Sequence, residues 1–312
     1  MVRIGTRRSV LALWQANFVK ARLETLWPKL RVEIVEVVTT GDRIVDRPLA
    51  AIGGKALFVK EIEDKLLSGQ VDLAVHSMKD VPASLPEGLS LICTLEREDP
   101  TDAFVARDPS ATPNIRSLPA GARLGTGSVR RACQLMSLRP DLVMVPIRGN
   151  VDTRLRKLEQ GDLHGLILAT AGLERLGLSG RITQRLDPEQ CLPAVGQGAM
   201  ALEGRMEDDK TRELVEGLGH RDSADCVAAE RAFLSRMEGG CHVPVAALAK
   251  LEAGELWLRG LVGEPDGSRM IFASKRMPRE MAQALGLAVA REVLEMGGEE
   301  VLASARGRLA GD

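Results

Sequence analysis

The sequence predicts an α/β protein with two similar lobes, each a parallel sheet with helices on both faces, followed by a small α+β domain with an antiparallel sheet. Three observations support this fold class. Strand-like and helical segments alternate through the first half of the chain, the alternation restarts after the polar segment Glu96–Pro100, and longer strand-like runs fill the C-terminal third. At 312 residues the chain is long enough for two domains or three small ones.

Each element of the two lobes follows from its local pattern. Short apolar or β-branched runs predict strands, and a hydroxyl residue before a helical run predicts a helix start, as at Ser9. The predicted strands are Val2–Ile4, Val32–Val38, Val71–Val75, Ala103–Ala106, Arg123–Leu124, Leu142–Ile147 and Gly165–Ala169. The predicted helices run from Ser9 to about Leu26 and over Ala56–Leu67, Ser128–Leu138, Val151–Gln160 and Ala171–Leu176. Two successive modules of this kind suggest a cleft between two lobes, with Pro193–Gly198 as the return crossing.

A different pattern predicts the third domain. A helix over Ser223–Met237 is followed by Gly239-Gly240, a good C-cap signal. The next strand-like runs are Val245–Lys250, Glu255–Val262 and Met270–Ala273, and a long helix over Pro278–Met296 comes after them. Strands joined by short turns favour an antiparallel sheet.

The charge balance argues against some classes of function. Lys and Arg total 42 and Asp and Glu total 43, so the net charge is −1, without the cationic excess of a protein that coats nucleic acid or an anionic membrane. Five Phe, three Trp and no Tyr leave few side chains for base stacking. The chain has 32 Arg and 10 Lys, a ratio that favours bidentate recognition of carboxylate or phosphate and that genomic base composition also produces.

The N-terminal residues and the cysteines indicate compartment and metal content. The chain starts without the basic-then-apolar layout of a signal peptide, and no apolar stretch is long enough to span a bilayer, so we expect a cytoplasmic protein. The five Cys and four His are widely spaced, without a C-x-x-C pair. This spacing predicts neither a disulfide framework nor a metal site.

Two turns in the second module share a design that suits anions. In Leu124–Arg131 and in Ile147–Arg154, a strand ends near glycine and a helix starts with arginine in its first turn. Free N–H groups, small residues and guanidinium groups together form an anion site. The helix dipole disfavours arginine at a helix N-terminus, so an external anion is one source of compensation. Solvation, or pairing with nearby carboxylates, is the alternative.

Two further segments are candidates for chemistry. Asp80 is predicted to lie beyond the carboxyl end of a parallel strand, where open α/β sheets place ligands and where it can act as general acid–base or as counter-charge for a cationic intermediate. Cys241 follows two glycines in a loop, where a thiolate can reach a ligand. Taken alone, an Asp in a loop is more often a turn former and a Cys more often a small buried residue. We expect His76 to be structural.

Short motifs run through the whole chain in one order. They are Ile4–Ser9, Thr40–Asp42, Gly53–Lys60, Val75–Pro82, Glu96–Pro100, Arg130-Arg131, Arg148–Asn150, Thr153–Leu155, Ala169–Leu173, Pro193–Ala199 and Glu238–Cys241. Together they resemble the hydroxymethylbilane synthase (porphobilinogen deaminase) family, and His76–Asp80 and Glu238–Cys241 are the most specific of them.

The resemblance implies a fold and a reaction. It implies a domain 1 over residues 1–96 and 194–216, a domain 2 over 97–193 and a domain 3 over 217–312, the first two doubly wound like the lobes of periplasmic binding proteins. It also implies a monomer with a dipyrromethane cofactor joined by a thioether to Cys241. Four units of porphobilinogen, the small-molecule partner, are added with loss of ammonia, and water releases linear hydroxymethylbilane for tetrapyrrole and haem biosynthesis.

The resemblance also implies the site residues. The catalytic aspartate falls on Asp80. Besides Cys241, the positions implied for cofactor binding are Ser77, Lys79, Thr126, Ser128, Arg130, Arg131 and Arg154. The positions implied for substrate binding are Arg7, Ser9, Lys55, Phe58, Arg148, Arg175 and Gln197. Each pyrrole carries an acetate and a propionate, so a dense guanidinium lining fits this chemistry.

Two positions depart from the family pattern, and one alternative function remains. Ala51 stands where many members have lysine, and Gly127 stands where a serine is usual in the turn before Ser128. Neither is the nucleophile or the acid, so we expect activity to survive. The alternative is a two-lobed binding module for a small anion, without chemistry, which predicts that Cys241→Ala leaves ligand affinity unchanged.

Overall fold

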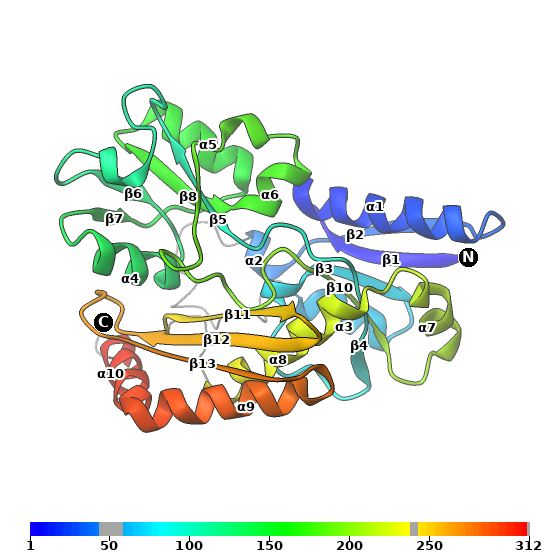
Figure 1. Ribbon diagram of the computed structural model, residues 1–312. Coiled ribbons are helices and arrows are strands. Elements are labelled where there is room, and N and C mark those ends of the chain that lie inside the picture. Colours follow the sequence, from blue (N-terminus) through cyan, green and yellow to red (C-terminus); the bar gives the residue numbers. More distant parts are fainter. Residues whose placement is uncertain (44–58, 238–242, 311–312) are drawn as a thin grey trace.

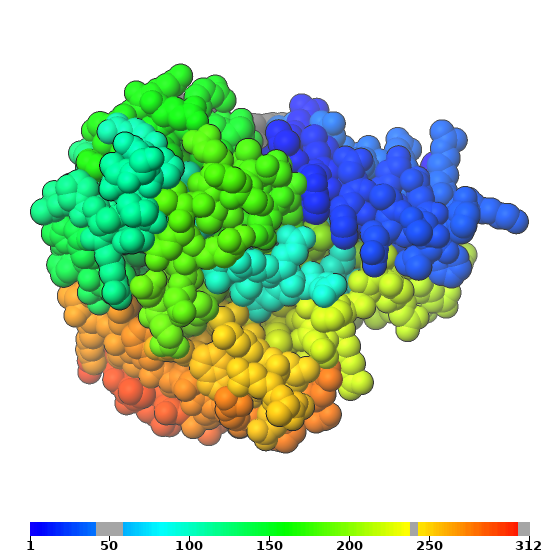
Figure 2. Space-filling view, turned by 45° about the horizontal axis from the view of Figure 1, so that its top comes forward, coloured from blue at the N-terminus to red at the C-terminus, as the bar shows by residue number. Residues whose placement is uncertain are grey.

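The computed structural model describes residues 1–43, 59–237 and 243–310. It contains two five-stranded sheets flanked by helices and one three-stranded antiparallel sheet, which confirms the predicted fold class. Figure 1 shows the two α/β lobes beside each other, with the C-terminal domain, drawn in yellow to red, packed along both of them. In the space-filling view of Figure 2 the three parts form one continuous body.

The first lobe has the strand order β2-β1-β3-β10-β4. Its strands are β1 (Val2–Arg7), β2 (Val32–Val37), β3 (Leu73–Ser77), β4 (Leu89–Thr94) and β10 (Met200–Arg205). Its helices are α1 (Val10–Leu26), α2 (Thr40–Arg43), α3 (Lys60–Leu67), α7 (Asp209–Glu216) and the short 3-10 helix η3 (Met78–Asp80). Ser9 caps α1 as predicted, because its side chain accepts from the Ala12 N–H at 3.2 Å.

The second lobe repeats this plan in the order β7-β6-β8-β5-β9. Its strands are β5 (Asp102–Ala106), β6 (Arg123–Gly125), β7 (Val143–Val145), β8 (Gly165–Ala169) and β9 (Gln184–Leu186). Its helices are η4 (Ile115–Ser117), α4 (Val129–Leu138), α5 (Val151–Gln160), α6 (Thr170–Arg175) and η5 (Ser179–Arg181). The α5 and β8 ranges match the predicted ones.

The chain passes between the two lobes twice, through residues 95–101 and through residues 187–199. Each passage delivers a strand that runs against its neighbours: β5 is antiparallel to β8 and β9, and β10 is antiparallel to β3 and β4. The prediction of wholly parallel sheets was therefore wrong. A strand that arrives from the other lobe has no crossover helix in its own lobe to bring it in parallel.

The third domain packs helices on one sheet. Its elements are α8 (Arg221–Met237), β11 (Val245–Glu252), β12 (Glu255–Gly263), β13 (Met270–Pro278), η6 (Arg279–Met281), α9 (Ala282–Val293), the wider turn η7 (Leu294–Gly298) and α10 (Glu299–Ala310). The helix predicted over Pro278–Met296 starts later than expected, because Pro278 ends β13 and α9 begins at Ala282 after η6. Gly297, just past the predicted end, takes a φ of +100° where α9 gives way to α10. The core between α8, α9 and the sheet includes Phe233, Leu258 and Val289, all fully buried.

No helix in the described ranges combines the length and the apolar character that crossing a membrane requires.

Candidate active site

The two predicted anion turns lie next to each other at the ends of β6 and β7. The Thr126 N–H donates to the Val145 carbonyl at 3.0 Å. A Cβ at Gly127 would lie 2.8 Å from the Ile147 carbonyl oxygen, so a side chain there would require the two turns to separate. The departure from the family pattern at Gly127 therefore has a packing reason in this chain.

Ser128 begins α4 as predicted. Its hydroxyl accepts from the Arg131 N–H at 3.4 Å, and its own N–H donates to the Thr126 hydroxyl at 3.2 Å. The hydroxyls of Thr126 and Ser128 therefore order the start of the helix that carries the two arginines.

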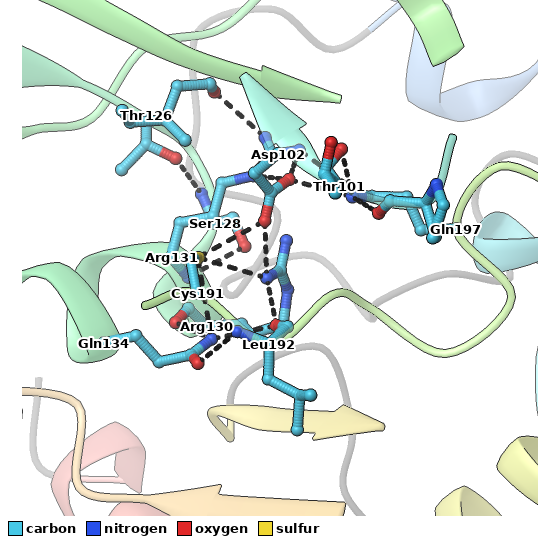
Figure 3. A network of polar contacts seen from close by, with 12 residues as sticks. Thr101, Asp102, Thr126, Ser128, Arg130, Arg131, Gln134, Cys191, Leu192 and Gln197 are labelled. Carbon is cyan, nitrogen blue, oxygen red and sulfur yellow. Dashed lines mark hydrogen bonds and ion pairs between the residues drawn. The ribbon is translucent and has the colours of Figure 1, made fainter. Parts of the chain in front are cut away.

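Arg130 and Arg131 are buried and share one carboxylate, that of Asp102 (Figure 3). Both guanidinium groups approach Asp102 to 2.7 Å, and each also donates to a main-chain carbonyl, Arg130 to Leu192 at 2.6 Å and Arg131 to Ile167 at 3.0 Å. An external anion was considered as the compensation for arginine at this helix start. For these two side chains it is an internal carboxylate instead.

Asp102 stays ionised despite complete burial. Burial alone raises the pKa of its carboxyl group, but the charges and hydrogen bonds of Arg130 and Arg131 outweigh burial and hold the pKa of Asp102 well below its usual range. One negative charge thus faces two positive charges, so this part of the site keeps a net positive charge.

Gln197, on the second passage between the lobes, connects this network to the first lobe. Its amide N–H donates to Asp102 at 2.9 Å and to the Pro100 carbonyl at 2.7 Å, and its amide oxygen accepts from Arg131 at 3.4 Å and from Lys79 at 3.5 Å. Lys79 precedes Asp80 in η3. Gln197 therefore holds Lys79 of the first lobe near the arginines of the second lobe.

Three cations here have no carboxylate within ion-pair distance in the described part of the chain: Lys79, Arg148 and Arg154. Burial lowers the pKa of Lys79 to about 8, burial and the charge of Arg131 lower the pKa of Arg154 to about 10, and burial lowers the pKa of Arg148. Arg154 donates to the Gly149 carbonyl at 2.7 Å. A bound anion would raise the pKa of each of these three cations, because a nearby negative charge favours their charged form.

Asp80 lies at a small pocket where the first lobe faces these cations. The pocket is lined by Arg7, Ser9, Gln15, His76, Ser77 and Asp80, among others. The Asp80 side chain makes no hydrogen bond or ion pair with another described residue, and its charge interacts with Lys79 and with Arg154 of the second lobe. Gln15 donates to Ser77 at 2.9 Å on the floor of this pocket.

Arg175 does not join this group. It is buried, pairs with Glu98 at 2.9 Å, donates to the Gly198 carbonyl at 2.7 Å and lies 5.9 Å over the Trp14 ring. In this structure it connects the second lobe to the passages between the lobes and to α1. Cys241, Lys55, Phe58 and Ala51 lie outside the described residues.

Sequence reasoning missed several residues that organise the site. Asp102, Gln15 and Glu230 carry no motif of their own, and Glu230 binds Arg97 at 2.5 Å and the Gly196 N–H at 2.7 Å. The one available signal was an aspartate directly before the apolar strand Ala103–Ala106. His76 is buried and paired with Glu203, and it also lines the pocket of Asp80.

In the described part of the site, the charges of five cations and two carboxylates interact with one another. The cations are Lys79, Arg130, Arg131, Arg148 and Arg154, and the carboxylates are Asp80 and Asp102. The excess of positive charge suits a ligand with several carboxylates.

Comparison with protein families decides what this site belongs to. A model described as "Porphobilinogen deaminase, dipyromethane cofactor binding domain" matches residues 2–213, and one described as "Porphobilinogen deaminase, C-terminal domain" matches residues 224–295. The chain belongs to the porphobilinogen deaminase family. It is therefore an enzyme that condenses porphobilinogen stepwise on a dipyrromethane cofactor in tetrapyrrole biosynthesis, and the reading as a binding module without chemistry is set aside.

The solved structures that match this porphobilinogen deaminase family member share little sequence with it. A YaeC-family lipoprotein of Enterococcus faecalis V583 is 13% identical, with 72% of this chain and 93% of that chain covered and a TM-score of 0.43. The periplasmic VFT2 domain of Bordetella pertussis BvgS is 17% identical, with 69% and 84% covered and a TM-score of 0.40. The periplasmic aliphatic sulphonate binding protein SsuA of Escherichia coli is 14% identical, with 76% and 70% covered and a TM-score of 0.41.

Proposed function

We propose that Asp80 is the catalytic acid–base of this enzyme and that the cations around it bind the carboxylates of cofactor and substrate. The observation that carries this proposal is the location of Asp80 at the open pocket, within electrostatic range of Lys79 and Arg154, neither of which has an ion-pair partner in the described chain. Because these cations come from both lobes, an anionic chain between the lobes would satisfy them together.

The donor set fits a dipyrromethane, which carries four side-chain carboxylates. Lys79 and Arg154, with the hydroxyls and N–H groups around Thr126 and Ser128, would hold its acetate and propionate groups, and Arg130 and Arg131 supply net positive charge behind them. When bound, the cofactor supplies the pyrrole carbon to which the next unit is joined. We propose Cys241 as the residue of attachment, on the family motif Glu238–Cys241.

The remaining cations are assigned to the incoming porphobilinogen. Arg148 and Arg7 would bind its carboxylates, with Ser9 near the same pocket. The Asp80 carboxylate would then stabilise the positive charge that develops on the pyrrole nitrogen as ammonia leaves, and would move a proton at that ring. Arg175 and Gln197 act differently in this scheme: Arg175 donates to the Gly198 carbonyl and Gln197 donates to Asp102, and these contacts hold the two passages between the lobes. Lys55 and Phe58 keep their family assignment as substrate contacts.

Intact mass spectrometry tests the attachment. The wild-type protein, incubated with porphobilinogen, should gain the mass of one dipyrromethane, and Cys241→Ala should remain at the mass of its polypeptide. Cys226→Ala is the matched control, because Cys226 is buried on α8 away from the proposed site and should load as the wild type does. A covalent adduct on Cys241→Ala, or a bare polypeptide mass in the wild type, would contradict the assignment.

Arg148→Met tests the substrate cations. Loss of one charge-assisted hydrogen bond to a carboxylate should lower kcat/KM for porphobilinogen about 10- to 100-fold. Arg156→Met is the control from the helix that follows Arg148, since Arg156 is exposed on α5 and, among the described residues, pairs with Asp152 at 3.6 Å. Equal kinetics for the two variants would remove Arg148 from the substrate site.

We also propose that the enzyme acts as a monomer in the cytoplasm. The two lobes that supply the cations and carboxylates of the described site belong to the same chain, which is compatible with a monomeric enzyme. Light scattering during size-exclusion chromatography should give a mass near 33.7 kDa. A dimer mass at assay concentrations would contradict the monomer.

A further inference from the structure

A second charged cluster adjoins the Asp80 pocket from inside the first lobe. It consists of His76 on β3, Glu203 on β10 and Glu63 on α3, with exposed fractions of 5%, 0% and 6%. The Nε2 atom of His76 lies 2.8 Å from Oε2 of Glu203. The reaction scheme above makes no use of these three side chains, and burial makes an ionised carboxyl group among them costly.

The cluster contains two carboxyl groups and one imidazole. Oε1 of Glu203 and Oε1 of Glu63 both lack a hydrogen-bond partner in the described chain. If both carboxyl groups were ionised, one imidazole would face two buried negative charges. Two carboxyl groups in one buried site resolve this by keeping a proton. Consistent with this, burial and the charge of Glu203 raise the pKa of Glu63 to about 7.

Within the described chain, no second cation forms an ion pair with the carboxyl groups of the cluster. Arg231 on α8 attracts Glu203, but its guanidinium group donates to the carbonyls of Pro82 and Ala83 at 2.8 and 3.1 Å. Arg205, on the same strand as Glu203, donates to the Leu66 carbonyl at 2.9 Å and pairs with Asp208 at 2.6 Å. Other ionisable groups on the packed elements include Lys60, Glu61, Asp64 and Lys65 on α3, Arg3 of β1, which pairs with Asp72 at 2.7 Å, Arg7 at the pocket, and the buried thiol of Cys93 on β4.

The His76–Glu203 contact lies directly before η3, the turn that carries Asp80. His76 pairs in register with Ala201, so its contact with Glu203 runs diagonally between β3 and β10 and fixes the end of β3. Ser77 and η3 with Asp80 follow at once, and His76 and Asp80 line the same pocket. A movement of the imidazole therefore changes both the wall of that pocket and the start of the turn.

We propose that His76 and Glu203 are positioning residues for Asp80, and that Glu63 carries the proton that keeps this buried cluster from holding two negative charges. The first half of this inference rests on the role proposed above for Asp80. The second half does not, because it concerns only where a proton is bound.

Infrared difference spectroscopy against pH tests the proton. As the pH of the loaded enzyme is raised through about 7, the wild type should lose the carbonyl band of a buried protonated carboxylic acid. Glu63→Gln should lack this change, and Glu213→Gln, on the exposed face of α7, should keep it. The same band change in Glu63→Gln would overturn the assignment of the proton to Glu63, whatever the role of Asp80.

Kinetics with cofactor-loaded variants test the positioning role. Glu203→Gln keeps an acceptor for His76 but removes the charge, and it should lower kcat about tenfold with KM within twofold and with the cofactor mass unchanged. His76→Asn should likewise lower kcat while KM stays within twofold. The double variant should lose no more kcat than the slower of the two single variants, because the two side chains act as a unit. The double variant replaces both side chains and provides the comparison with wild type if either single variant does not fold.

A kcat within twofold of wild type in a folded, loaded Glu203→Gln, or losses that multiply in the double variant, would overturn the positioning role. If Asp80→Asn itself kept normal turnover, the proposed function would fail while the infrared result for Glu63 still stood. The two failures are therefore distinguishable.

Discussion

Asp80→Asn should lower the turnover of porphobilinogen by about 10²- to 10⁴-fold while the fold and the bound cofactor remain. The amide has nearly the same shape as the carboxylate, but it can neither move a proton nor compensate a positive charge. Asp80 makes no side-chain hydrogen bond to another described residue, so its replacement removes no hydrogen bond within that part of the chain. Consumption of porphobilinogen and release of ammonia measure the turnover, and intact mass measures the cofactor.

The matched control is Asp162→Asn, because Asp162 is an exposed aspartate of the second lobe that pairs with Arg123 at the surface. It should turn over porphobilinogen at the wild-type rate. Turnover by Asp80→Asn close to that of this control would remove Asp80 from the chemistry. Loss of the cofactor mass would instead assign Asp80 to cofactor binding.

Asp102→Ala should reduce the free energy of unfolding by about 3–5 kcal/mol. The substitution leaves the guanidinium groups of Arg130 and Arg131 buried together without a carboxylate, and removes an acceptor from Gln197. Urea unfolding followed by circular dichroism measures the change. Asp141→Ala is the control, because Asp141 pairs with Arg139 at the surface, where an ion pair contributes at most about 1 kcal/mol.

The pH dependence of this effect has a defined sign. The pKa of Asp102 is held below its usual range in the folded protein, so its ionisation stabilises the fold above the unfolded value of about 3.9 and this contribution falls as the pH falls further. The difference in stability between wild type and Asp102→Ala should therefore be constant from about pH 5 to 8 and should narrow below about pH 4. A constant difference down to pH 3 would contradict the ion-pair explanation.

Local sequence patterns correctly predicted several helices, strands and caps whose formation depends on residues close together in the chain. The helix over Val151–Gln160, the strand over Gly165–Ala169 and the caps at Ser9 and Ser128 agree with the structure. The strands β4, β9 and β10 and the helices α7 and α10 were missed. The strand predicted over Val71–Val75 was placed two residues too early. Val71 belongs to the turn after α3, where its N–H donates to the Lys65 carbonyl, and β3 runs from Leu73 to Ser77.

The two arginine turns contain charges whose partners a local sequence pattern cannot identify. The pattern correctly indicated buried cations with an anion nearby, but not which anion. The structure divides them: Arg130 and Arg131 pair with Asp102, whereas Arg148 and Arg154 have no carboxylate partner in the described chain. Only the second pair keeps the predicted need for an external anion.

By itself, then, the sequence determined the fold class, the two turns at the second sheet, the family motifs and the location of Asp80 after a strand, because each depends on residues close together in the chain. Tertiary structure alone decided which charges compensate one another. Asp102 lies 29 positions from Arg131, and Glu203 lies 127 positions from His76. Such pairs leave no periodicity or spacing in the sequence, since only the packing of distant strands and helices brings them within the few ångströms over which a buried charge is neutralised.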